Sequence, residues 1–373
     1  MEILLISQIY PKENELYNGG FIHRRVINYQ LKASDVKIKV FVLDEQSSQA
    51  KSYIFEDVSV IRGNKKELIN YIKNNSIDKI LIHFINKDMM EVLRFFNYRF
   101  PTIIWVHGFE ALGWYRRLFN FNFKDFPKYA IKNMIQMKHL RKFIKEIFEK
   151  DVKFVFVSNW MKRILEFDTF SKVHNCEIIP NIVDDNIFKY TPKNTNMRKK
   201  ILLIRPFESR KYANDIAIKA IIELSSKPFF QEIEFTIYGK GKDFERLTGQ
   251  VSHFSNVHIF NEYLTQSQIA HVHKEHGVFL CPTRQDAQGV SMCEAMSSGL
   301  VPITSNNTAI PEFVKHNKTG YLTNNHTEIA KWIEHLFFNS SDFHRLSQET
   351  AISIKKQCNS DLIINKEMQL ISE

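Results

Sequence analysis

The stretch Val278–Pro302, VFLCPTRQDAQGVSMCEAMSSGLVP, decides the fold that we expect for the chain. It opens with a short apolar run that is typical of a buried strand, and a polar loop follows from Pro282 to Gly289. Val290 to Ser298 has the pattern of a helix, and Gly299 stands where a C-terminal cap belongs. A second apolar run, from Val301 to Thr304, completes a strand–loop–helix–strand unit, which predicts an α/β protein.

The polar loop of this stretch leads into the N-terminus of the helix, where free backbone N–H groups and the helix dipole favour an anion. Asp286 lies in the loop, and Glu294 lies about one turn into the helix. This arrangement suits a nucleotide-sugar diphosphate. The amides would hold the phosphate, and the carboxylates would accept hydrogen bonds from the ribose and sugar hydroxyls. An ordinary turn with two solvated acids is the alternative, and the local pattern alone does not decide between the two.

Length and composition limit the class of protein. A chain of 373 residues suggests two domains, and 44% apolar with 25% charged residues is ordinary for a globular protein. The four cysteines have neither metal-ligand spacing nor a disulfide framework, which indicates a reducing compartment. The N-terminus has the pattern of a first strand, not of a signal peptide, and no apolar run reaches the roughly 18 residues of a spanning helix. We therefore expect a cytoplasmic protein, soluble or peripheral on the inner face of the cytoplasmic membrane.

In the first half of the chain, predicted strands alternate with predicted helices, so the sheet should be mostly parallel. The loop from Tyr10 to Gly20 ends in a Gly19-Gly20 pair, which lets backbone approach a phosphate or sugar closely, although a plain turn gives the same pattern. His107 follows a predicted strand, Thr102–Val106, at the edge where α/β proteins place ligands. A structural role is the alternative for this histidine.

Residues 114–153 are rich in Lys and Arg, and aromatic residues interleave with the first part of the segment. This mixture, with the net charge of +10, suits peripheral contact with an anionic membrane. A helix that packs its aromatic residues on the first domain and exposes a basic face is an equally good interpretation. Nucleic acid is an unlikely partner by comparison.

The residues around 191–199 are polar and include Pro192, which predicts a linker. The α/β pattern then restarts with a strand from Lys200 to Ile204. Three cations follow it within seven residues, namely Arg205, Arg210 and Lys211. They could hold a diphosphate, with arginine as a bidentate fork and lysine as a point charge. A solvated basic loop is the alternative.

Taken together, these elements resemble the retaining GT-B glycosyltransferases of family 4, often called glycosyl transferases group 1, over nearly the whole chain. The E-x7-E element of that family matches Asp286 and Glu294, with aspartate in place of the first glutamate. The family's arginine and lysine on the donor phosphates match Arg205 and Lys211, and its first-domain histidine matches His107. The remaining matches are the phosphate-binding amides at Gly289, Val290 and Ser291, the Val157-Ser158 pair, and the N-terminal glycine loop at Gly19-Gly20.

The chain also departs from the family pattern. Non-glycine residues stand at four places where the family has glycine, namely Ile182, Ile204, Tyr212 and Ala309. Of the later G-x-x-E element only Glu312 remains. Asp286 is one methylene shorter than the usual glutamate, so the sugar preference could differ. The cations and Glu294 are kept, and activity is expected.

The resemblance implies the GT-B fold, with two Rossmann-like domains whose parallel sheets face a central cleft. We expect residues 1–190 to form the acceptor-binding domain, 191–199 the linker and 200–373 the nucleotide-sugar domain, with the last helix packing back on the N-terminal domain. It also implies that Arg205 and Lys211 offset the charge that grows on the leaving diphosphate. Glu294 would hold the ribose and Asp286 the sugar hydroxyls, with His107 near the reacting carbon. Arg210 and Gly20 join the donor-binding set, and no metal or other cofactor is expected.

The function implied is retaining transfer of a hexose from a nucleotide diphosphate sugar, with UDP favoured, to a lipid-linked or surface-polysaccharide acceptor. Two alternatives remain open at this point. One is a non-catalytic protein that binds membrane or nucleic acid and has a degenerate donor site. The other is a nucleotide-sugar epimerase on the same fold, for which the sequence has no clear signature.

Overall fold

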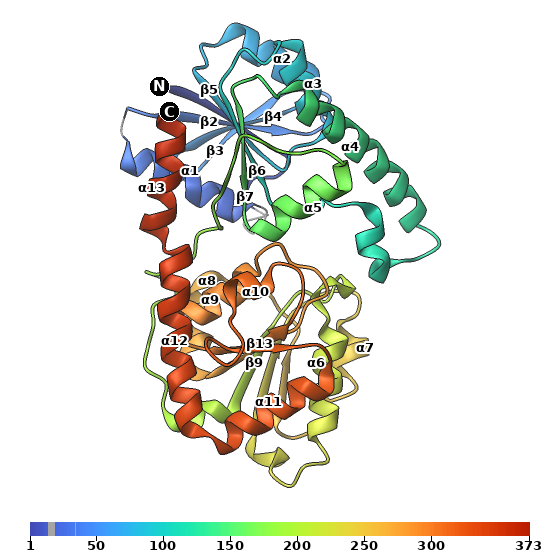
Figure 1. Cartoon of the computed structure of the whole chain (residues 1–373), viewed down its shortest axis with the longest axis vertical. Coiled ribbons are helices and arrows are strands. Elements are labelled where there is room, and N and C mark those ends of the chain that lie inside the picture. Colours follow the sequence, from blue (N-terminus) through green and yellow to red (C-terminus); the bar gives the residue numbers. More distant parts are fainter. Residues whose placement is uncertain (14–18, 34) are drawn as a thin grey trace. The chain divides into compact units, whose positions relative to one another are not determined.

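The computed structural model describes residues 1–13, 19–33 and 35–373. The chain divides into two units, of which the first contains Met1–Arg116, Asn122–Pro180 and Ile363–Glu373. The second unit contains Arg117–Phe121 and Asn181–Leu362. Each unit is built around a mostly parallel sheet with helices on its faces (Figure 1), and this confirms the predicted fold class. Part of the predicted loop from Tyr10 to Gly20, residues 14–18, lies outside the described residues.

The described part of the first unit has an eight-stranded sheet with the order β3-β4-β2-β1-β5-β6-β7-β8. All neighbouring pairs in it are parallel except β3 and β4. The central strands are buried along their length, as parallel strands covered on both faces must be. The strands are β1 (Glu2–Ser7), β2 (Lys37–Leu43), β3 (Lys51–Phe55), β4 (Val58–Gly63), β5 (Lys79–His83), β6 (Thr102–Val106), β7 (Val152–Phe156) and β8 (Cys176–Ile178).

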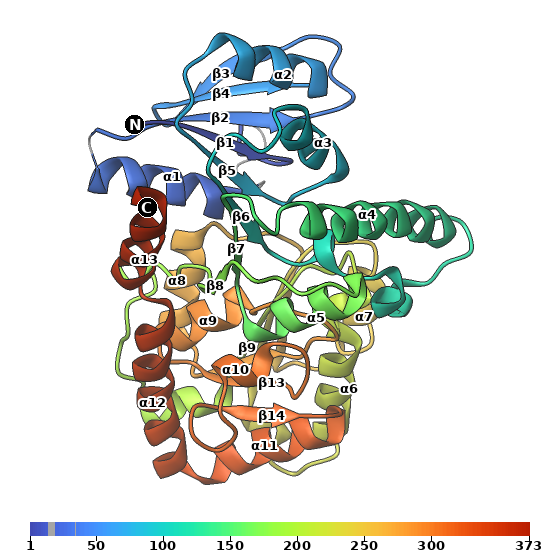
Figure 2. The same cartoon turned by 45° about the horizontal axis from the view of Figure 1, so that its top comes forward.

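The helices of the first unit include its C-terminal segment, α13, which lies beside α1 in both views (Figures 1 and 2). A buried ion pair joins these two helices, between Arg25 of α1 and Glu367 of α13. The α-helices are α1 (Gly20–Lys32), α2 (Lys65–Asn74), α3 (Lys87–Phe95), α4 (Phe126–Glu146), α5 (Asn159–Thr169) and α13 (Ser360–Ser372). Short 3-10 helices are η1 (Phe109–Ala111) and η2 (Trp114–Asn120), the second of which enters the second unit.

The described part of the second unit has a six-stranded sheet with the order β11-β10-β9-β12-β13-β14, in which every neighbouring pair is parallel. In chain order this is 3-2-1-4-5-6, the order of the Rossmann fold. The predicted strand–loop–helix–strand unit is present as β12, α9 and β13. The strands are β9 (Lys200–Ile204), β10 (Glu234–Tyr238), β11 (Val257–Phe260), β12 (Val278–Cys281), β13 (Val301–Ser305) and β14 (Tyr321–Thr323).

A core on one face of this sheet combines alternate strand residues, such as Ile201 and Leu203, with residues of the helices that pack there. The α-helices are α6 (Asn214–Leu224), α7 (Phe244–Thr248), α8 (Gln266–Glu275), α9 (Val290–Ser297), α10 (Ile310–Phe313), α11 (His326–Phe338) and α12 (Ser340–Cys358). The 3-10 helices are η3 (Thr195–Lys199), η4 (Arg210–Tyr212) and η5 (Phe230–Glu232).

The division into units differs from the predicted one, in which the first domain ends at 190 and a linker covers 191–199. The second unit already begins at Asn181, because its backbone N–H donates to the Gln288 side chain over 2.6 Å. Lys193, within the predicted linker, is buried and donates to the backbone carbonyl of His273 over 2.6 Å. The segment 191–199 is therefore packed on the second unit.

Candidate active site

The strand order of the second unit reverses between β9 and β12, so the loops after these strands diverge at the carboxyl edge of the sheet. Open parallel sheets bind their ligands at such a point. Arg205 is the first residue after β9, and Asp286 lies in the loop after β12. The structure thus gathers at one edge of the second unit the predicted residues Arg205, Arg210, Lys211, Asp286, Gly289, Val290, Ser291 and Glu294.

Arg205 is 4% exposed and is held by the loop after β12. Its Nη2 donates to the backbone carbonyl of Cys281 over 3.2 Å, and its Nη1 lies 3.8 Å from Oδ2 of Asp286. The buried Nε of Arg205 has no hydrogen-bond partner among the described residues. Such a group costs about 1–3 kcal/mol when it is left unsatisfied. A fixed guanidinium with an N–H to spare is suited to bind an anion.

The Asp286 carboxylate is engaged in its own loop. Its Oδ1 accepts the backbone N–H of Gly289 over 3.0 Å, while its Oδ2 faces Arg205. The backbone N–H of Asp286 donates to Oγ1 of Thr308 over 3.2 Å. Asp286 therefore orients both Arg205 and the start of α9. The N–H of Gly289, which the sequence comparison assigns to phosphate, is used by Asp286 here.

Helix α9 begins after Gly289, whose φ of 82° lies in the left-handed region. A Cβ at this position would also come within 3.1 Å of Cδ1 of Ile310, so glycine fits both the backbone and the space. No side chain caps the N-terminus of α9. Val290 and Ser291 are its first residues, and N–H groups in the first turn have no partner within the helix. These N–H groups form the positive end of the helix dipole, which favours an anion at this terminus.

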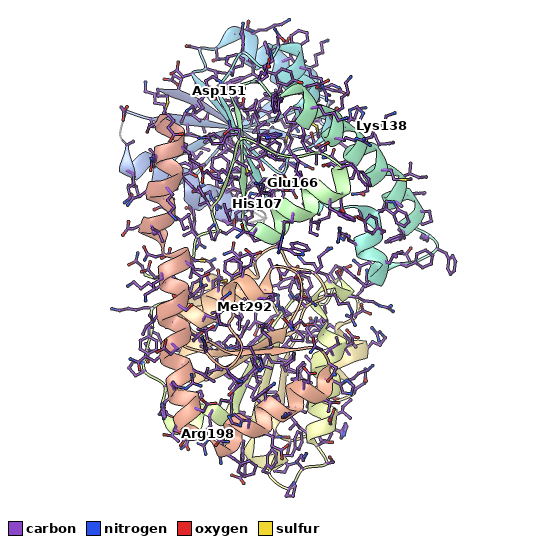
Figure 3. The ribbon with its side chains drawn as sticks, viewed as in Figure 1. His107, Lys138, Asp151, Glu166, Arg198 and Met292 are labelled. Carbon is purple, nitrogen blue, oxygen red and sulfur yellow. The ribbon has the colours of Figure 1, made fainter. Side chains whose placement is uncertain are left out.

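Glu294 lies on the same face of α9 as Ser291, because residues three apart in a helix are neighbours on its surface. Both are half-buried, whereas Met292 and Cys293 are buried and hold the opposite face of the helix in the core. Figure 3 marks Met292 on this helix. The carboxylate of Glu294 is therefore placed one turn away from the amides at the start of α9, as expected for a group that binds hydroxyls next to a phosphate.

Lys211 and Arg210 belong to η4, which is tied to the loop after β12. The carbonyl oxygen of Lys211 accepts the backbone N–H of Arg284 over 2.8 Å. The ring of Tyr212 lies near both cations that the sequence predicts to bind phosphate, since Cζ of Arg205 lies 5.6 Å and Nζ of Lys211 5.3 Å from its centroid. At these distances a cation is attracted to the ring face. The sequence comparison identified Tyr212 only as a lost glycine.

The pair of Arg284 and Asp215 was not predicted from the sequence. Two nitrogens of Arg284 donate to the two oxygens of Asp215 over 2.8 and 2.7 Å, and Arg284 also donates to the carbonyl of Arg210 over 2.7 Å. Burial opposes ionisation of Asp215, but these hydrogen bonds hold its pKa below the ordinary value. Arg284 thus connects the loop after β12 to η4 and α6. A cavity of about 310 Å³ opens beside this pair, with Arg210 and Phe207 in its wall.

His107 and Gly20, the other predicted site residues, lie in the first unit. His107 follows β6 and contacts Phe21, the neighbour of Gly20, with ring centroids 5.0 Å apart. A Cβ at Gly20 would meet nothing within 4 Å, so there is open space beside its backbone. His107 and Gly20 therefore lie near one another at the carboxyl edge of the first sheet. Figure 3 marks His107.

The backbone at His107 is fixed by Glu110. The N–H groups of His107 and Gly108 donate to the two carboxylate oxygens of Glu110 over 2.5 and 3.0 Å. Burial of this carboxyl raises its pKa to about 7, although the backbone hydrogen bonds act in the opposite direction. Gly108 has a φ of 155°, which permits this tight turn directly after the strand.

The described residues contain no group of three or more His, Cys, Asp or Glu side chains that could hold a metal ion. Their helices include none that is both long enough and apolar enough to cross a membrane.

Comparison with known proteins bears on the fold and on the second unit. Residues 185–351 match the family model described as Glycosyl transferases group 1. None of the curated protein sequences matches the chain.

Several solved structures share the fold over the full length of this chain. Sucrose-phosphate synthase (tll1590) from Thermosynechococcus elongatus has 15% identity and a TM-score of 0.75, with 100% of this chain and 98% of that chain covered. Anabaena Alr3699/HepE in complex with UDP and glucose has 13% identity and a TM-score of 0.71, with 100% and 99% covered. Trehalose-6-phosphate synthase OtsA has 10% identity and a TM-score of 0.70, with 100% and 99% covered.

These likenesses extend over both units, whereas the family match lies within the second. The matched segment begins before β9 and contains Arg205, Lys211, Asp286 and α9, the parts from which the candidate site is built. The chain therefore has the fold of the GT-B glycosyltransferases, and its residues 185–351 are similar to the family Glycosyl transferases group 1.

Proposed function

We propose that the chain transfers a hexose, with retention of anomeric configuration, from a UDP-sugar to a lipid-linked or surface-polysaccharide acceptor. The observation that carries this proposal is the buried Arg205, which is held between Cys281 and Asp286 and keeps an unsatisfied Nε within the described part of the chain. The choice of UDP is supported by Anabaena HepE, a structural relative described in complex with UDP and with UDP-glucose.

In this mechanism the chain's own cations and amides stabilise the leaving group. Arg205 and Lys211 offset the negative charge that grows on the diphosphate as the glycosidic bond breaks, and the first N–H groups of α9 assist them. The guanidinium of Arg205 is fixed before the reaction by its contacts with the loop after β12, and the backbone from which the Lys211 side chain extends is held by its bond to Arg284. Little reorganisation is then needed when charge develops, which is the basis of electrostatic catalysis.

The carboxylates take two different parts in the proposal. Glu294 binds the ribose hydroxyls from the face of α9 that it shares with Ser291. Asp286 binds sugar hydroxyls with the acceptor capacity that remains after its hydrogen bond from Gly289 and its ion pair with Arg205, since an ionised carboxylate has about four lone-pair sites. Asp286 is 14% exposed, so its carboxylate remains accessible. His107 contacts the sugar near the reacting carbon.

A panel of nucleotides tests the donor assignment through thermal stabilisation of the whole chain. UDP at a hundredfold excess over its dissociation constant should stabilise the folded state by about 2.7 kcal/mol, and GDP, ADP or CMP should do less. The double variant Arg205→Ala/Lys211→Ala should lose the response to UDP and the transfer activity. Lys274→Ala, which removes an exposed cation of α8, is the matched control and should keep both. Absence of a response to every nucleotide would favour the binding-protein alternative.

The acceptor side of the proposal is supported by the surface of the first unit. Phe123 is 89% exposed and Ile131 is 55% exposed, while Ile135, one turn further along α4, is 47% exposed. Exposed lysines accompany them, among which Lys138 is marked in Figure 3 on α4. Apolar side chains amid basic ones are typical of a segment that contacts an anionic bilayer, where a lipid-linked acceptor would be found.

Vesicle flotation tests this contact. Reversal of three exposed lysines, Lys128→Glu/Lys132→Glu/Lys138→Glu, should weaken binding to anionic vesicles by about 1 kcal/mol or more per residue. Lys274→Glu is the control with an exposed lysine in the second unit. Equal flotation of all three proteins, or flotation that does not depend on anionic lipid, would remove the electrostatic argument for a membrane-bound acceptor.

A further inference from the structure

The cavity beside η4, α6 and α7 in the second unit is separate from the residues predicted to bind the donor. Its volume of about 310 Å³ is at the lower end of the range for small-molecule sites. The described residues that line it include neither Arg205 nor Lys211, and none of them belongs to α9. Arg210 lines it, although Arg210 is the direct neighbour of Lys211 in η4.

The cavity and the start of α9 lie towards opposite faces of the second sheet. Helix α6 connects β9 to β10 and α9 connects β12 to β13, which are crossovers in opposite directions along the sheet. Because such crossovers are right-handed, the two helices cover opposite faces. Ala217 of α6 and Leu247 of α7 share one core, and both views show α9 on the other side of the strands (Figures 1 and 2).

The wall of the cavity has an excess of one positive charge. Three guanidinium groups, those of Arg210, Arg246 and Arg284, accompany the two carboxylates of Asp215 and Asp243. Arg284 is bound to Asp215 through two nitrogens. The guanidinium of Arg210 makes no hydrogen bond or ion pair with the residues that the structure describes, since its hydrogen bonds are those of its backbone. An anionic group in the cavity can therefore pair with Arg210 without breaking an existing ion pair.

Asp243 and Arg246 of the cavity wall provide both acceptors and donors. Nε and Nη2 of Arg246 donate to Oδ1 of Asp243 over 3.1 and 2.6 Å. Nη1 of Arg246 and Oδ2 of Asp243 have no hydrogen-bond partner among residues 1–13, 19–33 and 35–373. The two side chains are 58% and 21% exposed, so a ligand can reach them. A donor next to an acceptor suits a hydroxyl group, which both donates and accepts.

Phe119 of η2 adds an apolar surface to the same cavity. Its side chain is half-buried, and its segment is held on η4 by Asn120. The Asn120 side chain donates to Oγ of Ser209 over 2.9 Å and accepts the backbone N–H of Arg210 over 3.2 Å. The negative face of an aromatic ring attracts C–H groups, which a sugar ring presents on its faces. The hydroxyls of such a sugar would lie at its rim, where the polar groups of the wall are needed.

We propose that this cavity is a binding site for a single sugar unit that carries an anionic group, a phosphate or a carboxylate. Arg210 pairs with the anionic group, Asp243 and Arg246 bind hydroxyls, and Phe119 packs against the sugar ring. The small volume limits the ligand to about one such unit. The site uses neither Arg205 nor Lys211, so the inference does not rest on the proposed transfer reaction.

Calorimetry of the whole chain tests the ligand class. The probes are the 6-phosphates of glucose, galactose and mannose, glucuronate and galacturonate, the three parent sugars, and inorganic phosphate. At least one anionic sugar should bind about tenfold or more tightly than its parent sugar and than inorganic phosphate, as one hydrogen bond to a charged group requires. A preference for the sugar phosphates or for the uronates identifies the anionic group. Equal affinity for a parent sugar or for inorganic phosphate, or no binding of any anionic sugar, would overturn the proposal.

The variant Arg246→Ala locates the bound sugar. It should weaken binding about tenfold or more, because it removes a charged hydrogen-bond donor from the cavity. Arg345→Ala is the matched control, since Arg345 forms the same i,i+3 ion pair with Asp342 and its side chain is 47% exposed. The control should bind the sugar as the wild type does. Equal affinities of the two variants would overturn the proposal.

Competition with UDP separates this cavity from the donor site. Saturating UDP should leave the affinity for the anionic sugar unchanged, and displacement of the sugar by UDP would overturn the proposal. If the chain does not respond to UDP, the proposed transfer function fails and the variant Arg205→Ala/Lys211→Ala takes the place of this arm. That variant should still bind the anionic sugar, because the cavity keeps Arg210, Asp243 and Arg246.

Discussion

Glu367 offers a direct test of how α13 is held, because its side chain is 0% exposed and accepts hydrogen bonds from Arg25, Tyr29 and Trp105 of the first unit. The Nε–H of Arg25 donates to its two oxygens, which lie 3.0 and 3.3 Å away. The hydroxyl of Tyr29 donates over 2.7 Å and the Nε1–H of Trp105 over 3.0 Å. Substitution Glu367→Ala removes the acceptor for all three residues and leaves Arg25 buried with its balancing charge gone.

The expected loss follows from burial on both sides of the pair. Removal of one partner from a buried ion pair costs about 3–5 kcal/mol, because the remaining charge is uncompensated. Glu367→Gln keeps the shape and one acceptor oxygen, so it should cost less, about 1.5–3 kcal/mol for the lost charge-assisted bond. The control is Glu373→Ala, which breaks the contact with Lys153, where the Glu373 side chain is 51% exposed. An exposed pair of this kind contributes at most about 1 kcal/mol.

Urea unfolding, followed by tryptophan fluorescence, measures these differences, and Trp105 in the first unit reports on the site directly. With a urea dependence of about 1–3 kcal/mol per molar, Glu367→Ala should lower the midpoint of the first-unit transition by about 1 M or more. The three proteins should rank Glu373→Ala, Glu367→Gln, Glu367→Ala in order of increasing loss. The reasoning is refuted if Glu367→Ala unfolds at the same urea concentration as Glu373→Ala.

Three further predictions concern single residues. Gly289→Ala puts a Cβ on a backbone with φ 82°, 3.1 Å from Ile310, so it should lower the free energy of unfolding by about 1–2 kcal/mol. It should also weaken UDP binding measured by calorimetry, and unchanged affinity would argue against phosphate at α9. The pKa of Glu110 is raised from 4.5 to about 7, so its ionisation in the folded state is unfavourable and its contribution to stability declines as pH rises through 7. Wild type should therefore lose about 3 kcal/mol between pH 4.5 and 7 relative to Glu110→Gln in urea unfolding, and a constant difference would contradict this. Tyr212→Leu removes the ring that lies near two cations and should weaken UDP binding about 2- to 10-fold. Tyr212→Phe keeps the ring and should not weaken it. Equal affinities of the two variants for UDP would exclude a role for the ring face.

The part of the site that the sequence predicts is the part encoded locally. The apolar runs on either side of the loop at Asp286 predict β12 and β13, and Gly289 with the helical pattern after it predicts α9. Arg205 follows the strand pattern of β9 in the same way. Once parallel strands are assumed, residues that follow them share one edge of the sheet, so the grouping of Arg205 and Asp286 can be inferred without coordinates.

Pairings between distant residues carry no such local signal. Arg284 lies in the loop after β12 and Asp215 in the first turn of α6, and neither is distinguished from an ordinary surface residue by its neighbours in sequence. His83 ends a strand whose apolar pattern predicts a core residue. Its 2.8 Å contact with His107 is visible only in the structure. Tyr212 interrupts a family pattern, and the position of its ring beside two cations depends on how η4 folds.

Strand β3 and helix α3 have weak signals in the sequence, each for its own physical reason. Strand β3 is mostly exposed or half-buried at an edge, so it lacks the apolar run that marks the central strands. It pairs with β4 through a turn at Glu56 and Asp57, both with positive φ and neither a glycine, so the usual turn signal is absent. Helix α3 is nine residues long, and the side chain of Asn86 caps it, a signal that is easily taken for part of a loop.

The position of α13 has a consequence for biosynthesis. Domains generally fold as units while the chain is made, starting with the N-terminal one. Here Ile363–Glu373, with the carboxylate that satisfies Arg25 and Trp105, is synthesised only after the whole of Asn181–Leu362. All residues of the second unit are therefore synthesised before the last residues of the first unit. Until α13 emerges, the nascent first unit must keep a cation and an indole N–H without their native acceptor, and its final folding step comes last.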